Sequence, residues 1–180
     1  MKSIRTNIVL SVIVAVFAAV PALAQSQTMT DAHVARIKQS CGLALSTLGR
    51  IHEDDAPVYI NRNQTYFSIS DKMMATLNSR LALNHYDASD LVKTASDFNK
   101  ALNDFRTAYK TYDDTMSTLV HIDCQQVPVT FYDTATAARE QRDAVHQTVV
   151  RLQQLIDQYR QNVANFKAKN FPGQSGGSNG

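Results

Sequence analysis

Residues 91–119 read LVKTASDFNKALNDFRTAYKTYDDTMSTL. Apolar and aromatic side chains recur in this stretch with an unbroken four-three alternation. They are Leu91, Ala95, Phe98, Leu102, Phe105, Tyr109, Tyr112, Met116 and Leu119. A repeat of about 3.5 residues keeps one narrow stripe of a helix against a neighbouring helix along its whole length. The stretch therefore predicts a long helix that packs in a coiled-coil seam.

The same register returns in residues 131–166, so a second long helix is expected there. Its seam positions are Phe131, Ala135, Ala138, Arg142, Val145, Val149, Leu152, Ile156, Tyr159, Val163 and Phe166. One of them, Arg142, is charged, and an arginine on a buried stripe needs a partner. Pro128 suits the start of this helix, and Pro172 is expected to end it.

A further helix is expected to begin near Thr28 or Thr30, with one irregularity inside it. Its inner stripe is Val34, Ile37, Cys41, Ala44, Leu48 and Ile51, and then Tyr66, Ile69, Met73, Leu77 and Leu81. Between the two halves lies His52-Glu53-Asp54-Asp55-Ala56-Pro57. Pro57 removes a backbone hydrogen bond, so we expect the helix to be kinked or broken near residues 52–57.

Two details of this first helix follow from the same pattern. The acidic cluster before Pro57 is interpreted as a solvent-exposed kink, because four consecutive helical side chains point in different directions and do not converge on a cation. Of the adjacent pair Met73 and Met74, the helical period places Met73 in the core.

The connections between these long helices are short, which favours antiparallel neighbours. The predicted fold is all-α: an elongated antiparallel three-helix coiled-coil-like bundle over residues 25–172. A Gly/Ser-rich tail follows at residues 173–180 and is expected to be flexible.

Residues 1–24 have the features of a cleavable signal peptide. Lys2 and Arg5 precede an apolar run at residues 8–20, and Ala22-Leu23-Ala24 provides small residues before the expected cleavage point. The alternative is an uncleaved anchor. Cleavage would reduce the 18 basic residues to 16, equal to the 16 acidic residues. We therefore expect a secreted or periplasmic protein with no integral membrane segment after cleavage and no affinity for nucleic acid.

The two cysteines, Cys41 and Cys124, most simply form a disulfide in an exported protein, which would stabilise the fold by roughly 4 kcal/mol in the chain-entropy model. A thiol or metal pair is the alternative. Counted from a turn near Asp87, Cys41 lies nine residues further away than Cys124. Two ideal helices would then be offset by about 13 Å, too far for a disulfide, so the expected kink must absorb the excess.

Counting through the turns places Arg142 beside a set of polar residues. The predicted polar layer comprises Arg62, Tyr66, Tyr112, Asp113, Arg139 and Arg142. Its guanidinium groups outnumber its carboxylate, so it could hold a small anion. The favoured interpretation is structural: an ion network that fixes the helix register, or an arginine stem that extends outward to solvent.

No nucleophile motif and no helical pair of metal-binding histidines occurs in the chain. We expect no catalytic residues, no metal and no cofactor. The predicted function is that of a non-catalytic helical protein of the cell envelope, with a scaffold or protein-interaction role, a protein partner and a monomeric state favoured. The alternative is a chaperone-like or sensor-like periplasmic binding protein that uses the polar layer around Arg142.

The order of these features carries a resemblance. A signal peptide and an early cysteine are followed by a turn with Tyr86-Asp87 and Leu91, then Asp123-Cys124, Val127-Pro128 and the pair Arg139 and Arg142. Over most of the chain this order resembles the uncharacterised exported helical proteins of ultra-small candidate-phyla bacteria. The resemblance implies export and a long helical hairpin clamped by paired cysteines, and it implies no activity.

Overall fold

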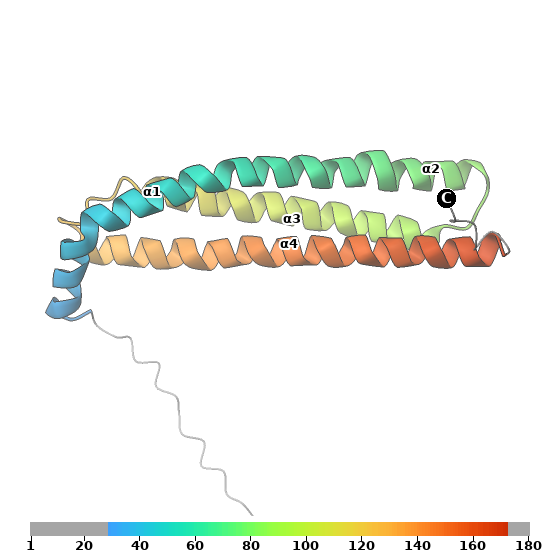
Figure 1. Cartoon of the computed structure of the whole chain (residues 1–180). Coiled ribbons are helices and arrows are strands. Elements are labelled where there is room, and N and C mark those ends of the chain that lie inside the picture. Colours follow the sequence, from blue (N-terminus) through green and yellow to red (C-terminus); the bar gives the residue numbers. More distant parts are fainter. Residues whose placement is uncertain (1–28, 173–180) are drawn as a thin grey trace, which may run out of the picture.

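The computed structural model describes residues 29–172, and every regular element in that range is helical (Figure 1). Four α-helices and one π-helical segment follow one another: α1 (Asp31–Ser68), η1 (Ile69–Ala75), α2 (Thr76–Leu83), α3 (Ser89–Leu119) and α4 (Pro128–Asn170). Because α1, η1 and α2 are continuous, we call them together the first arm. The first arm, α3 and α4 lie side by side in Figure 1, which confirms the predicted all-α three-helix bundle.

The expected signal peptide and the expected tail fall on residues 1–28 and 173–180, outside the described residues. Within residues 29–172, none of the helices combines enough length with enough apolar character to span a bilayer.

The seam of α3 is the centre of the core. All nine predicted seam positions are buried, and Phe98 and Leu119 are completely excluded from solvent. On α4 the seam continues through Phe131, Ala138, Val149, Leu152 and Tyr159, all of them buried. Burial of a large apolar side chain contributes about 1.5–3 kcal/mol, so the packing of α3 on α4 provides most of the apolar stabilisation.

The seam of α4 departs from the prediction at Arg142. Its side chain is 56% exposed, because the stem runs outward from the seam and the guanidinium lies at the surface. Leu155, which the four-three pattern leaves out, is completely buried instead.

The kink of the first helix is confirmed, and the helix is not broken. Residues 52–57 remain helical, with Pro57 inside α1. Figure 1 shows that the beginning of α1 turns across the end of the bundle, while the rest of the first arm runs along α3 and α4.

Contacts between the first arm and α3 locate the change of register. Near the turn, each contact joins a residue of the first arm to a residue of α3 that lies the same number of residues from a point between Asn84 and His85. These pairs are Asn78–Leu91, Ser70–Asn99 and Asn63–Arg106. On the other side of Pro57, the contacting pairs His52–Asp113 and Cys41–Cys124 are centred instead on a point between Ala82 and Leu83. The stretch that contains Pro57 therefore takes up four residues without adding length. The other five of the nine excess residues disappear because the turn is centred between Asn84 and His85 rather than at Asp87.

With the excess absorbed, Cys41 and Cys124 form a disulfide across the end of the bundle. Their Cα atoms lie 5.7 Å apart, inside the usual range for a disulfide. Both residues are buried beside Met116 and Phe131, so the covalent link is part of the core.

The placement of the two methionines was predicted wrongly. Met74 is buried at 2% exposure, whereas Met73 is 64% exposed. The reason is η1: a π-helical turn holds more residues than an α-helical turn, so the buried face moves forward by one position. Tyr66, Ser70 and Met74 face the core in sequence, and the hydroxyl of Ser70 donates a hydrogen bond to Asn99 on α3.

The first arm ends in a Schellman motif. The backbone N–H of Tyr86 donates to the carbonyl of Leu81, and that of His85 donates to the carbonyl of Ala82, both at 3.0 Å. The motif requires one residue with a left-handed backbone conformation, and His85 adopts this conformation with φ 57°. At the other end of the arm, the hydroxyl oxygen of Thr30 caps α1 by accepting from the N–H of His33.

Candidate functional site

Asp55 joins all three layers of the bundle at one point. It projects from α1, and its two carboxylate oxygens accept from Arg142 of α4, from Nη2 at 2.8 Å and from Nε at 3.0 Å. The hydroxyl of Tyr112, on α3, donates to the same carboxylate at 2.6 Å. The side chain of Asp55 is only 19% exposed, so this charge depends on its two partners rather than on water.

The environment keeps Asp55 ionised. Partial burial alone would raise the pKa of this carboxyl, but the hydrogen bonds from Arg142 and Tyr112 hold it below its ordinary value. The hydrogen bond from Arg142 to Asp55 in turn raises the pKa of the guanidinium. Burial, and then the bond to Asp55, raise the pKa of the Tyr112 hydroxyl. Tyr112 is therefore a neutral donor at physiological pH and is not poised to lose its proton.

A second polar contact lies one turn earlier on α1. The ring nitrogen Nε2 of His52 is 2.8 Å from Oδ1 of Asp113, on α3. His52 and Asp55 are three residues apart and therefore share one face of the helix. The interpretation of this cluster as a solvent-exposed kink is wrong for His52 and Asp55, and holds for Glu53 and Asp54, which are exposed.

A groove opens beside Asp55 between the first arm, α3 and α4. It has a volume of about 340 Å³, and we call it the tyrosine groove. Its lining residues are Asp55, Val58, Tyr59, Arg62, Phe105, Tyr109, Tyr112, Arg142, Asp143, Val145 and His146. Tyr59 and Tyr109 stack in parallel with ring centroids 3.7 Å apart, and Phe105 lies 5.4 Å from Tyr59. One wall of the groove is thus a rigid aromatic surface.

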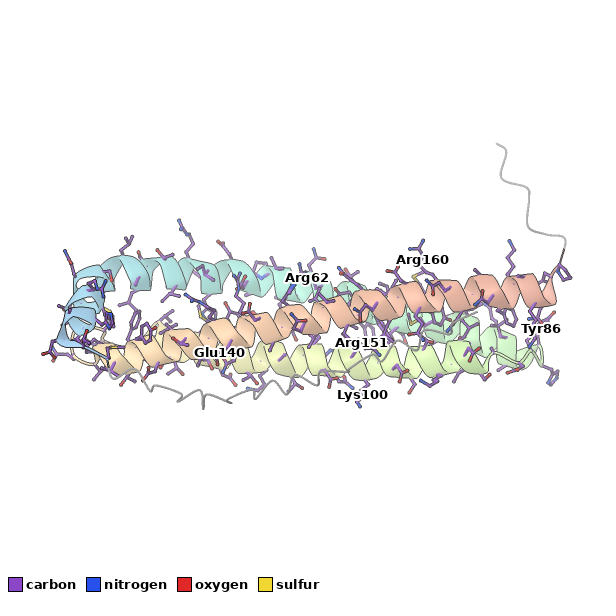
Figure 2. The ribbon with its side chains drawn as sticks, turned by 90° about the horizontal axis from the view of Figure 1, so that it is seen from below. Arg62, Tyr86, Lys100, Glu140, Arg151 and Arg160 are labelled. Carbon is purple, nitrogen blue, oxygen red and sulfur yellow. A yellow bond between two sulfur atoms is a disulfide. The ribbon has the colours of Figure 1, made fainter. Side chains whose placement is uncertain are left out.

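The tyrosine groove contains two carboxylates and two guanidinium groups. Asp55 and Arg142 form an ion pair, whereas Arg62 and Asp143 each have no ion-pair partner among residues 29–172. Figure 2 shows Arg62 on the first arm along the side that adjoins α4. Burial, followed by the carboxylates of Asp113 and Asp55, raises the pKa of Tyr109 to about 12. The groove therefore presents neutral phenols, one guanidinium without a salt bridge at Arg62 and one such carboxylate at Asp143.

The predicted polar layer is brought together only in part. Tyr112 and Arg142 meet at Asp55, Asp113 lies one turn away with His52, and Arg62 lines the tyrosine groove.

The other two members of the layer lie elsewhere. Tyr66 is buried against Phe98 and Phe105, with ring centroids 6.3 Å and 5.7 Å away, and burial raises the pKa of its hydroxyl. Arg139 is exposed and forms no side-chain hydrogen bond or ion pair within the described part of the chain.

Asp55, His52 and Tyr59 are the site residues that sequence reasoning missed. A signal for them exists, because the four-three alternation continues through Pro57 at Cys41, Leu45, Leu48, His52, Asp55, Tyr59, Arg62 and Tyr66. Carried through the proline, this register puts a carboxylate on the inner face at Asp55, where Arg142 needs one.

In the range 29–172, no three His, Cys, Asp or Glu side chains converge closely enough to hold a metal ion. Comparisons with protein-family models, with curated proteins and with solved structures found no match. Function is therefore inferred from the geometry of this chain alone.

Proposed function

We propose that this chain is an exported, non-catalytic protein of the cell envelope that works as a protein-interaction module through its first arm. The observation that carries the proposal is the distribution of exposed large apolar side chains. Six of them lie on the first arm: Leu43, Val58, Ile60, Phe67, Met73 and Leu83. The long faces of α3 and α4 carry few, and those at Val92, Val129 and Tyr132 lie near the starts of the helices. Those on the first arm lie on more than one side of it, so this element offers several exposed apolar contacts to a partner.

The disulfide supports the proposed compartment. A disulfide persists in oxidising surroundings, and the Cys41–Cys124 link is compatible with an extracytoplasmic location. The expected signal peptide and the resemblance to exported helical proteins point the same way. An elongated bundle tied at one end by a covalent bond suits a scaffold that presents a long helical face.

Site-specific photocrosslinking in the native cell tests the proposal. A photoreactive phenylalanine analogue replaces Phe67 on the first arm or, as the matched control, Tyr132 on α4; the two side chains are 50% and 51% exposed. We expect a protein adduct of discrete mass at position 67 and none at position 132. Equal labelling at both positions, or none at either, contradicts an interaction face on the first arm.

A second function is favoured by the tyrosine groove. Its volume of about 340 Å³, its aromatic wall and Arg62 suit a small aromatic anion, which would make the chain a periplasmic binding protein. Benzoate, added in a thermal-shift series, should raise the melting temperature of the oxidised protein. Arg62→Gln should abolish the shift and Arg139→Gln should retain it, whereas equal shifts in both variants would exclude this function.

A further inference from the structure

A second groove lies between the first arm and α4, nearer the turn that joins α2 to α3. It has a volume of about 620 Å³, and its surface is mainly apolar. Met73 and Leu77 contribute from the arm, and Val163 and Ala164 contribute from α4. Met73 is there because η1 has turned it off the core face, and it leaves 64% of its surface exposed. An apolar floor of this kind is an incomplete contact between helices.

Cations line both edges of this groove, and we call it the basic groove. Lys72 and Arg80 stand on the arm, Arg160 and Lys167 stand on α4, and none of the described lining residues is acidic. Arg160 is 3.4 Å from Asp157, but the other three form no ion pair among residues 29–172. Figure 2 shows Arg160 on the edge of α4 next to the first arm, with Lys100 of α3 on the opposite side of the bundle.

The spacing of the lining residues has the geometry of a helix-binding groove. The arm contributes positions 72, 73, 76, 77 and 80, and α4 contributes 159, 160, 163, 164 and 167 with the same spacing. Each stripe covers nine residues, and its ends are about 12 Å apart, roughly two helical turns. Two parallel stripes of this length match the apolar face of a short amphipathic helix, whose anchors repeat every three to four residues.

We propose that the basic groove binds an amphipathic helix of a partner protein that has an apolar stripe flanked by Asp and Glu. This inference rests on the proposed interaction function and names its surface and the chemistry of its partner. Apolar anchors would cover Met73 and Leu77, and the flanking carboxylates would pair with the cations on the two edges. Rim charges of this kind set specificity and the rate of association.

The distribution of charge distinguishes this occupant from the others. Residues 1–28 and 173–180 contain no Asp or Glu, so the ends of this chain lack side-chain carboxylates to match the four cations. A single-headed lipid carries its charge at one end, whereas these cations follow both edges of the groove. A helix with acidic residues on both flanks matches the arrangement along its whole length.

A designed peptide of about three helical turns provides the probe. It carries leucines on one face and glutamates on both flanks, and its comparison peptide has lysine at every glutamate position. Binding to the oxidised protein is followed by fluorescence anisotropy at low and high salt. We expect the glutamate peptide to bind at least about tenfold more tightly than the lysine peptide, with an affinity that falls as salt rises.

Two variants connect the binding to the groove. Reversal of two exposed charges on the edges of the groove, Lys72→Glu with Lys167→Glu, should lower the affinity for the glutamate peptide at least about tenfold and raise the affinity for the lysine peptide. Met73→Gln should lower the affinity for both peptides, because it removes an apolar contact at an exposed position. Lys100→Glu is the matched control on the opposite side of the bundle, and it should bind the glutamate peptide like the unmodified protein.

The proposal is overturned if the two peptides bind equally or if charge reversal leaves the affinity unchanged. Binding to phosphatidylglycerol vesicles without binding to the peptide would instead identify a lipid surface as the occupant. Self-association in analytical ultracentrifugation that Lys72→Glu abolishes would identify a second copy of the chain. If the basic groove fails these tests while crosslinking at Phe67 persists, the proposed interaction function stands and only its location is wrong.

Discussion

The α3–α4 pair and the first arm are long helices of the same bundle, but different interactions hold them in place. The pair is joined by a continuous apolar seam along the whole of α3. The first arm buries few large side chains, namely Tyr66, Met74 and Leu81 besides Cys41.

Partly buried apolar side chains of the arm also pack against the core, and polar contacts and one covalent bond are added to them. The arm's links to the other helices include Asp55–Arg142, Asp55–Tyr112, His52–Asp113, Asn63–Arg106, Asn78–Tyr159 and the disulfide Cys41–Cys124. Apolar packing is insensitive to direction, whereas hydrogen bonds and ion pairs require particular partners. The difference indicates that α3 and α4 provide stability while the first arm is positioned by specific contacts. Both grooves open along the border between this arm and α4.

The largest effect is expected in the apolar pair. Phe105→Ala should destabilise the protein by about 3–5 kcal/mol, because Phe105 is 1% exposed and its removal leaves a cavity against Tyr59 and Tyr66. Phe67→Ala is the matched control at a half-exposed position and should cost far less. Urea denaturation measures both. Similar losses in the two variants would show that the seam is not the main source of stability.

Removal of the covalent link should affect the arm selectively. Cys41→Ser with Cys124→Ser is expected to cost about 2–4 kcal/mol of global stability, since the link closes a long loop. Hydrogen exchange should quicken most around residue 41 in α1 and least in the middle of α3. A uniform increase along all three helices would contradict the division between arm and pair.

The ion pair at Asp55 should contribute less, and its contribution should depend on pH. Asp55→Asn is expected to cost about 2 kcal/mol near neutral pH, because it removes the charge that Arg142 and Tyr112 bind. The hydrogen bonds from Arg142 and Tyr112 hold the pKa of Asp55 in the folded protein below the ordinary value of 3.8. Its stabilisation is therefore complete above that value and disappears as the pH falls through the folded-state pKa.

Asp54→Asn provides the matched control for Asp55→Asn, since Asp54 is exposed on the neighbouring position. Urea denaturation between pH 7 and strongly acidic conditions should show the difference between the unmodified protein and Asp55→Asn closing at low pH. A gap that stays constant at all pH values would mean that the carboxylate charge is not the stabilising feature.

The smallest effect is expected at the end of the arm. His85→Gly should stabilise the protein by about 1 kcal/mol, because His85 has φ 57° and glycine adopts this left-handed conformation without a steric cost. His85→Ala retains the steric cost of the left-handed conformation and should give no gain in stability. Thermal denaturation distinguishes the two variants, and equal melting temperatures would show that the turn is not strained.

Local pattern was sufficient to predict the parts of the fold where the helical period is regular. The seam of α3 and the start of α4 at Pro128 follow from the local pattern alone. The pairing of Cys41 with Cys124 was inferred from the presence of just two cysteines in a chain expected to be exported. The kink could be inferred because the two cysteines had to meet. The site was predicted less well, since Pro57 was treated as the edge of the inner stripe while the backbone carries the stripe through it.

Two errors have the same physical origin, which is a change of register that side-chain periodicity does not report. The count along the helices placed Arg142 at the level of Arg62 and Tyr66 on the first arm, but the curved arm uses more residues per unit length and brings Asp55 to that level. The burial of Met74 depends on η1, where the polar Ser70 turns inward to bond Asn99. A polar residue on a core face carries no hydrophobic signal, so the π turn is invisible to a search for apolar repeats.

The π turn also sets which changes of length the first arm can accept. Loss of one residue inside Ile69–Ala75, such as Asp71, would convert this segment to a regular α-helix and leave Tyr66, Met74 and Leu81 on one four-three stripe. The same loss on the other side of Tyr66 would turn half of the arm out of register with α3. Melting temperatures of the two deletion variants would show this difference. We therefore expect the arm to accept a one-residue deletion inside this segment and to be destabilised by the same deletion on the other side of Tyr66.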